Sequence, residues 1–468
     1  MTAPVDSQTS ISEGPRLRRV LSLWDLIAYG IIYISPLAPA TFFGVLTRRS
    51  NGHAATCILL AMVAMSLTAV SYGRMARAYP SAGSAFTYVG RELSCSLGYI
   101  TGWSIALDYL LNPTICVIYS SQQAHVFLPA VPYWVWAVSF TGLLTVLTAQ
   151  GVKVSARVNT WLALGMGAVV LVYFAAAMIF ISHHPHAGPA FYTHPFYDVK
   201  TWTTTGILGG TSLAVLAYMG FDGISTLSEE AKKPRDVMFA TVLTCVAIGL
   251  LSTLEVYVAQ LVWPRAEPFP DLDTAFSFVA QRAWAPLFGV VGLTLIVGSV
   301  GGGMTGQLAA ARLLYGMGRG GALPRAFFGA IDPKRHVPRN NVLFLGAIAV
   351  AASLILPLIA GEATGFELAS SLLNFGALIA FMGVNASAFM RFFWRAPQRT
   401  VLNFAMPALG FLVCLLLWWN LSTQARTLGL VWMAVGIAFG AWKTRGFQAN
   451  LIQFDLSLDA PPQTVRNS

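Results

Sequence analysis

Charged residues are scarce in this sequence. Asp, Glu, Lys and Arg make up 10% of its 468 residues, whereas 56% are hydrophobic. An ordinary soluble domain carries roughly 25% charged residues. The shortage of charge excludes a soluble globular protein, and the sequence predicts a chain that lies mostly in lipid.

Cysteine is also rare, with five residues scattered along the chain and no paired spacing. A disulfide framework or a cysteine metal site is therefore excluded. The histidines at 183, 184, 186 and 194 have no acidic or cysteine partner nearby, and we interpret them as part of a polar loop. We expect no metal and no cofactor.

Apolar runs long enough to cross a bilayer recur along the whole chain. Twelve can be counted, near residues 22–46, 54–73, 97–122, 132–150, 158–182, 203–228, 239–263, 285–311, 341–361, 368–390, 402–421 and 426–443. The sequence therefore predicts an all-α polytopic membrane protein with 12 transmembrane helices and no separate soluble domain.

The basic residues indicate an orientation, because cytoplasmic loops collect Lys and Arg. With the N-terminus inside, 23 of the 29 basic residues fall on the inner side. This asymmetry, together with anionic lipid, explains the net charge of +10 without a nucleic-acid partner. We expect an inner-membrane protein with both termini cytoplasmic.

The expected organisation has four parts. A cytoplasmic tail over residues 1–20 lacks the apolar segment of a cleaved signal, so we expect it to be retained. It precedes a ten-span core at 21–395, two further spans at 396–445 and a second cytoplasmic tail at 446–468.

Two of the predicted spans are interrupted. Pro36 and Pro39 lie near the middle of the first span, so we expect the backbone from Ile34 to Ala38 to be unwound. In the sixth span, Gly220 and Gly223 bracket Phe221 and Asp222. Irregular backbone at this depth survives only where it faces protein or a watery cavity.

The two breaks occupy corresponding places if the first ten spans form two halves of five. Five is an odd number, so the two halves would be inverted relative to each other in the membrane. Matched broken helices at a repeat interface are the best sequence pointer to the binding site of a secondary transporter. Either break alone is explained as well by a simple kink of the helix as by a binding site. Two breaks at matched positions, of which the sixth-span break contains an acidic residue, favour a binding site.

The chain resembles the amino acid-polyamine-organocation (APC) superfamily of permeases. The similar segments are GFDGISTLSEEAKKPRD at 220–236, YPSAGSAFTYV at 79–89, GWSIALDYLL at 102–111, GVKVSARVN at 151–159, ARLLYGMGRGGALP at 311–324 and NFGALIAF at 374–381. Within the superfamily, the pattern is most similar to that of bacterial putrescine importers. The resemblance implies a LeuT-like 5+5 inverted-repeat fold with broken helices 1 and 6.

Two departures from the family pattern bear on the cargo. Amino acid permeases break the first helix with a glycine-rich segment whose free amides receive the substrate carboxylate, whereas this chain has Ser35-Pro36-Leu37-Ala38-Pro39. Fewer free amides favour a substrate without a carboxylate. Some relatives carry a titrating lysine in the fifth span, where this chain has Met166.

Asp222 is the strongest candidate for contact with an ammonium group, because it lies in the break itself. Its alternative role is to cap the second half-helix. Asp108 in the third span either binds an amine or pairs with a basic residue of another helix. Glu229 and Glu230 are assigned to gating or coupling, as an inner-gate ion pair or a solvated edge, with direct contact to the substrate as the alternative.

The remaining candidates are chosen by position. Aromatic rings can surround an ammonium group, although a single aromatic residue is more often a packing residue. Those predicted to contact substrate are Tyr33, Ile34, Ser35, Pro36, Leu37, Ala38, Tyr109, Asn112, Tyr218, Met219, Gly220, Phe221, Gly223, Ser225 and Asn374. Ser299 and Thr305 in the eighth span are secondary candidates for ion coupling, with close helix packing by small residues as the alternative.

We predict a secondary active transporter that imports a cationic amine, putrescine by preference. Proton symport with alternating access is implied by the resemblance, with sodium as the other coupling ion. The first alternative is a permease of the same superfamily for a cationic or neutral amino acid. A membrane-embedded enzyme or sensor is the distant alternative, and no catalytic constellation supports it.

Overall fold

The computed structural model describes residues 21–79, 84–150, 152–184, 188, 190–228, 231–264, 267–319, 323–332, 335, 337–361, 364–444 and 446–447. Within these residues the regular structure is helical, apart from an isolated bridge between Leu21 and Ala231. The first tail and most of the second, at 1–20 and 448–468, lie outside the described residues.

The helices follow the predicted runs. The first half of the chain contains α1 (Leu23–Ile34), η1 (Ala38–Thr41), α2 (Phe43–Arg49), α3 (Ala54–Ala78), α4 (Ser84–Glu92), α5 (Cys95–Phe127), α6 (Tyr133–Ala149), α7 (Val152–His183) and α8 (Ala190–Thr193). The sixth span comprises α9 (Thr204–Ala214), η2 (Val215–Tyr218) and η3 (Phe221–Leu227).

The second half continues with α10 (Pro234–Val262), α11 (Ala275–Ala283), α12 (Leu287–Arg319), α13 (Arg325–Phe328), α14 (Arg339–Ile359), α15 (Gly365–Phe389) and η4 (Met390–Trp394). It ends with α16 (Val401–Trp419) and α17 (Thr423–Lys443). Each of the twelve predicted runs thus coincides with helical structure.

Nine helical segments of the described chain are long and apolar enough to cross a membrane. The predicted fold class, a polytopic helical membrane protein, is confirmed, whereas the count of twelve spans stays a prediction. The first span is divided by its break, α6 is a shorter apolar helix, and α5 carries Asp108 and Asn112 in its middle.

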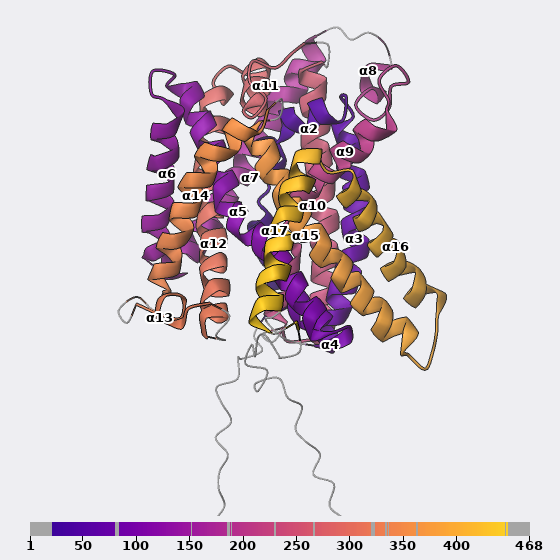
Figure 1. The fold of residues 1–468 in the computed structure, drawn as a ribbon. Helices are drawn as coiled ribbons and strands as arrows, with labels where there is room; N and C mark the ends of the chain where they lie inside the picture. The colour runs from indigo at the N-terminus through magenta and orange to yellow at the C-terminus, as the bar shows by residue number, and fades with distance from the viewer. Residues whose placement is uncertain are drawn as a thin grey trace, which may run out of the picture.

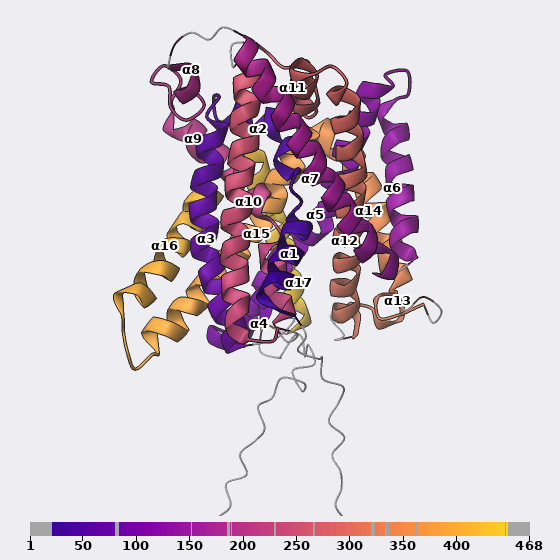
Figure 2. The same cartoon turned by 180° about the vertical axis from the view of Figure 1, so that it is seen from behind.

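The long helices stand side by side in one bundle (Figure 1). Seen from behind, α1 lies beside α10, with which it packs, and α12 and α14 stand on the other side of α5 (Figure 2). We call the end of the bundle where α1 begins the N-terminal face. The other end, which carries α2 and α11, is the opposite face.

Small residues allow the helices to approach closely. A Cβ atom at Gly73 of α3 would clash with the Cα of Met238 on α10, and one at Gly376 of α15 would clash with the Ser104 carbonyl oxygen of α5. Neither position tolerates a larger side chain without a backbone shift. This is the usual packing device of helices in membranes, where the lipid supplies no hydrophobic drive.

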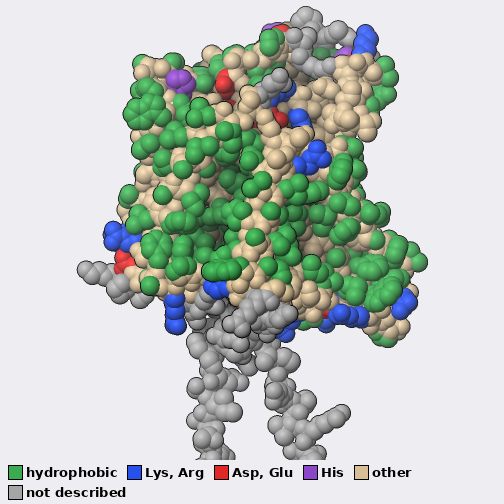
Figure 3. Space-filling view, in the orientation of Figure 1, with side chains coloured by type: hydrophobic (Ala, Val, Ile, Leu, Met, Phe, Trp, Pro, Cys, Tyr) green, Lys and Arg blue, Asp and Glu red, His purple; other side chains and the backbone are tan. Residues whose placement is uncertain are grey.

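The surface of the bundle fits a lipid environment. Hydrophobic side chains cover its middle, and Lys and Arg gather along the N-terminal face (Figure 3). Trp161, Leu358 and Val401 are 71%, 83% and 82% exposed. Large apolar side chains so exposed on many helices would be costly in water, whereas lipid accommodates them.

Candidate substrate-binding site

The first break lies where the prolines predicted it. The α-helix stops at Ile34, and Ser35 adopts a positive φ of 73°. Residues from Ala38 to Thr41 then form a short 3-10 helix, with the Thr41 hydroxyl donating to the Ala38 carbonyl at 2.7 Å. The prediction of an interrupted first span is confirmed, with the non-helical link at 35–37.

Few backbone amides are free in this break. Pro36 and Pro39 have no N–H group. The N–H of Ser35 donates to Ile31 and that of Ala38 donates to Ser35, at 3.1 and 3.2 Å. Within the described stretch 35–39, only the Leu37 N–H has no backbone acceptor. A single free N–H group is a poor receptor for a carboxylate.

The sixth span is interrupted over a longer stretch than predicted. Its α-helix ends at Ala214, one 3-10 helix follows, and a turn at Met219 and Gly220 then precedes a second 3-10 helix. Gly220 has a φ of 111°, which favours glycine because it has no Cβ. The half of the sixth span that follows the break is a 3-10 helix, Phe221–Leu227, with Gly220 as its N-cap.

Asn374 of α15 supports the start of this break. Its side-chain amide donates to the carbonyls of Ser212 and Leu213 at 2.8 and 3.3 Å, in the last turn of α9 where the α-helix gives way to η2. The Oδ1 atom of Asn374 is buried and has no hydrogen-bond partner among the described residues. Asn374 therefore anchors the sixth span and keeps one free acceptor.

Asp222 lies in the first turn of η3 and is only 8% exposed. Its carboxylate lies against the backbone N–H groups of Gly220, Asp222 and Gly223. The alternative interpretation of Asp222, as the acid at a positive helix end, is thus supported by its contacts. This contact leaves acceptor capacity for a ligand, because a carboxylate has about four lone-pair positions.

Asp108 of α5 and Asp222 lie close enough to repel each other electrostatically. Asp108 is half-buried, whereas Asp222 is buried. In the part of the chain that the structure describes, neither acid forms an ion pair with Lys or Arg. The site therefore brings together two unneutralised carboxyl groups from different helices.

Aromatic residues that the sequence analysis missed lie beside these acids. The ring of Tyr72 from α3 contacts Phe221 and Phe381 edge to face, with centroids 5.5 and 5.7 Å apart. Tyr72 also meets Tyr88 of α4 at 6.2 Å, and both tyrosines interact electrostatically with Asp222. The Tyr72 hydroxyl is buried without a hydrogen-bond partner among the described residues, whereas the Tyr88 hydroxyl lies within reach of the Ser225 side chain.

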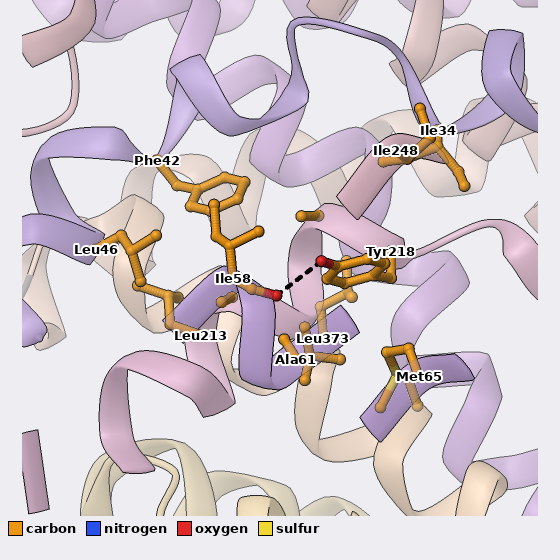
Figure 4. Packing of buried hydrophobic residues seen from close by; sticks show 14 of the residues in the cluster. Ile34, Phe42, Leu46, Ile58, Ala61, Met65, Leu213, Tyr218, Ile248 and Leu373 are labelled. Atoms are coloured by element: carbon orange, nitrogen blue, oxygen red, sulfur yellow. Dashed lines mark hydrogen bonds between the residues drawn. The ribbon is translucent and has the colours of Figure 1, made fainter. Parts of the chain in front are cut away.

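Tyr218 lies apart from this aromatic cluster. Its hydroxyl donates to the Ile58 carbonyl of α3 at 2.8 Å, and its ring packs among Ala61, Met65 and Leu373 (Figure 4). The packing role that was the alternative for every aromatic candidate fits Tyr218. The side chain of Tyr33 lies outside the described residues, whereas Tyr109 is half-buried next to Asp108.

The other candidates are divided between site and scaffold. The Oδ1 atom of Asn112 is buried without a partner in the described region and packs over Gly306 of α12. The Thr305 hydroxyl donates to Gly301 within its own helix at 3.1 Å, and Ser299 is half-buried on the same helix. Ile34, Pro36 and Leu37 are buried, whereas Ser35, Ala38 and Met219 are partly exposed.

Ser225 connects the sixth span to α4. Its hydroxyl donates to the Asp222 carbonyl at 2.6 Å and lies 3.0 Å from the Ser84 hydroxyl. The gating candidates Glu229 and Glu230 lie outside the described residues. Among the described residues, the contact between Ser225 and Ser84 of α4 therefore connects the site to the N-terminal face.

A carboxylate that the sequence did not single out organises the N-terminal face. Glu92 is 3% exposed and accepts hydrogen bonds from Tyr79 at 2.6 Å, from Arg391 at 2.7 Å and from Arg395 at 3.1 Å. These residues lie far apart in sequence, so no local motif reveals the cluster. It fastens α4 to the end of α15 and to η4.

At the opposite face, Arg48 of α2 forms an ion pair with Glu367 of α15. Glu367 is 4% exposed, and its N–H donates to the Thr364 hydroxyl that caps α15. The pair joins the second half of the broken first span to the tenth span.

The sequence matches the amino acid permease family model over residues 42–457. The chain belongs to the amino acid permease family. The permease is 32% identical over 451 residues to the low-affinity putrescine importer PlaP of Escherichia coli (strain K12), an alignment that covers 94% of this chain and 96% of the relative. The predicted superfamily is thereby confirmed.

Relatives with lower sequence identity are named for other substrates. The permease is 25% identical to the branched-chain amino acid permease BcaP of Lactococcus lactis subsp. cremoris (strain MG1363), over 90% of this chain and 93% of that one. The vacuolar cationic amino acid transporter 4 of Arabidopsis thaliana is 26% identical, over 80% and 63%. These relatives are transporters, and the permease is a transporter rather than an enzyme.

A solved structure supports the fold. A mutant of the manganese transporter of Eremococcus coleocola superposes with a TM-score of 0.55 at 13% identity, covering 92% of the permease and 98% of that chain. At this identity the likeness concerns the fold alone. It agrees with the predicted transporter architecture with interrupted helices.

Proposed function

We propose that this permease imports a cationic amine, putrescine by preference, with its N-terminal face toward the cytoplasm. The observation that carries the proposal is the pair of carboxyl groups at Asp108 and Asp222, which lie in the bundle without a basic partner among the described residues. An intramembrane carboxylate needs a counter-charge. A diamine supplies two, one for each acid.

The surroundings suit such a cargo. The rings of Tyr72 and Phe221 lie beside Asp222, where aromatic rings can border an alkyl chain and a ring face can attract an ammonium group. The membrane potential favours entry of a cation by ~2.3 kcal/mol per charge per 100 mV. Alternating access then requires the Arg48–Glu367 pair to open toward the outside and the Glu92 cluster to loosen toward the inside.

Proton symport is the proposed coupling, and Glu255 of α10 is a candidate carrier. Both of its carboxyl oxygens are buried without a hydrogen-bond partner in the described chain, and the Tyr173 hydroxyl nearby is also unpaired. A carboxyl group in such a place is stable only with a proton or a bound cation. It can therefore take up and release a proton as the helices move.

The amino acid alternative is favoured by the relatives BcaP and cationic amino acid transporter 4. The occupied amides of the first break argue against it, because a substrate carboxylate would find few donors there. The decisive experiment compares uptake of labelled putrescine, ornithine and leucine into proteoliposomes under imposed proton or sodium gradients. Uptake of leucine without putrescine would contradict the proposal.

A further inference from the structure

A cavity lies at the opposite face, away from Asp222. It has a volume of about 240 Å³ and is lined by Ile118, Gln122, Tyr133, Asp273, Pro357, Thr364 and Gly365. These residues come from α5, α6, the segment before α11, α14 and α15. The cavity is smaller than the roughly 300–1,000 Å³ that drug-sized ligands occupy, so it suits a small metabolite.

Asp273 supplies an unsatisfied acceptor in this cavity. The residue is 2% exposed, and the Thr364 hydroxyl lies within hydrogen-bonding reach of its carboxylate. Its Oδ1 atom is nevertheless buried without a hydrogen-bond partner among the described residues. A buried acceptor without a donor is costly, and an N–H group of a ligand would remove that cost.

The charges around Asp273 favour a cation. Asp271 precedes it, Glu367 faces it from α15, and Arg48 of α2 is the one basic group among its described electrostatic neighbours. Arg48 is paired with Glu367, so the negative charge of the two Asp residues is not balanced. Among the described residues, Tyr119 and Tyr133 are the other titratable groups that interact with Asp273, and a tyrosine hydroxyl ordinarily carries no charge near pH 7.

The remaining lining residues complement an alkylammonium group. Gln122 has a side-chain carbonyl that can accept from N–H groups. The hydroxyl of Tyr133 is committed to the Ser353 carbonyl at 3.0 Å, which holds its ring at the wall of the cavity. Ile118 and Pro357 provide apolar surface for methylene groups.

We infer that this cavity is an external binding site for an organic ammonium ion, in which Asp273 and Gln122 receive the N–H groups and the Tyr133 ring flanks the alkyl chain. The inference rests on the proposed amine cargo. It adds a second, weaker site, which concentrates the cargo next to the Arg48–Glu367 pair before that pair opens.

External pH should control this site. Burial raises the pKa of the Asp273 carboxyl to about 7, an effect that Asp271 and Glu367 reinforce and Arg48 opposes. Since the charged form receives the cation, affinity falls as the pH drops through this value. Between pH 8 and pH 6 the decrease should be about tenfold.

The test is equilibrium binding of radiolabelled putrescine to the purified full-length permease at pH 8. The wild type should show two components. Asp273→Asn should remove the weaker one and keep the tighter, which also demonstrates that the variant is folded. Asp222→Asn should remove the tighter one, and Glu267→Gln, an exposed acid of the same loop paired with Arg282, should change neither.

The possible failures are distinguishable. A single component that Asp222→Asn abolishes and Asp273→Asn leaves intact would overturn the external site and keep the proposed function. A weaker component that persists in Asp273→Asn, or that is as strong at pH 6 as at pH 8, would also overturn it. Absence of any putrescine binding by the wild type would overturn the proposed function and the external amine site together.

Discussion

The hydroxyl of Ser35 donates to the Sδ atom of Met166 at 3.3 Å, which ties the first break to α7. A Cβ atom at Gly298 of α12 would clash with the end of the same methionine. Met166 is 6% exposed at this meeting of three helices. An uncharged, flexible side chain therefore fills the space between the first break, α7 and α12.

Met166→Lys should impair amine transport. The new ammonium group would lie at the first break and repel a cationic cargo in a region of low dielectric constant. We expect the apparent affinity for putrescine to fall at least about tenfold, or roughly 1.4 kcal/mol. Proteoliposome uptake measures it, with Met166→Leu as the volume-conserving control. Unchanged uptake by the lysine variant would show that the cargo does not approach the first break.

Asp222→Asn should abolish most putrescine uptake. Removing one charge of a buried pair typically costs about 2–5 kcal/mol, so a decrease of at least about 30-fold is expected. Asp236→Asn, at the start of α10, is the control and should transport normally. If Asp222→Asn binds and transports like the wild type, the acid only stabilises the helix end.

Glu255→Gln should separate uptake from its driving force. The amide cannot carry the proton, so uptake driven by a proton gradient should fall several-fold while exchange of internal for external putrescine continues. Both reactions can be followed in the same proteoliposomes. Equal dependence on the proton gradient in wild type and variant would remove Glu255 from the coupling mechanism.

Arg48→Gln should weaken the closure at the opposite face, because Glu367 loses its charged partner. We expect reduced uptake, with partial recovery in the exchanged pair Arg48→Glu with Glu367→Arg. Arg49→Gln, its sequence neighbour, serves as the control. Recovery in the exchanged pair would establish a direct interaction, whereas no recovery would indicate separate roles.

Glu92→Gln should destabilise the permease by about 1–2 kcal/mol, because charge-assisted bonds from two arginines are weakened at a buried acceptor. The arginines are partly exposed and can regain water, which limits the loss. Thermal unfolding in detergent measures the change. Glu267→Gln removes an exposed ion pair and should remain within about 0.5 kcal/mol of the wild type.

The sequence predicted both interruptions because proline and glycine act locally. It did not reveal Tyr72, Tyr88 and Phe381, which reach the site through helix packing from α3, α4 and α15. Tyr218 was selected by its position next to the break, yet its direction is decided by the Ile58 carbonyl of a neighbouring helix. Contacts between segments that are distant in sequence therefore could not be predicted from the sequence alone.

The sixth span has more hydrogen bonds to other helices before its break than after it. Asn374 holds the carbonyls of Ser212 and Leu213, and the Ser212 hydroxyl donates to Leu417 of α16 at 2.7 Å. Between Phe221 and Leu227 the described hydrogen bonds to other helices reduce to the Ser84–Ser225 contact, and the next fastening is at Lys232, whose N–H donates to the Leu21 carbonyl at 2.9 Å. Amide hydrogen exchange should thus be slower at 207–214 than at 221–227. A rotation of Asp222 about Met219 and Gly220 would therefore break fewer of these bonds than a movement of the segment before them.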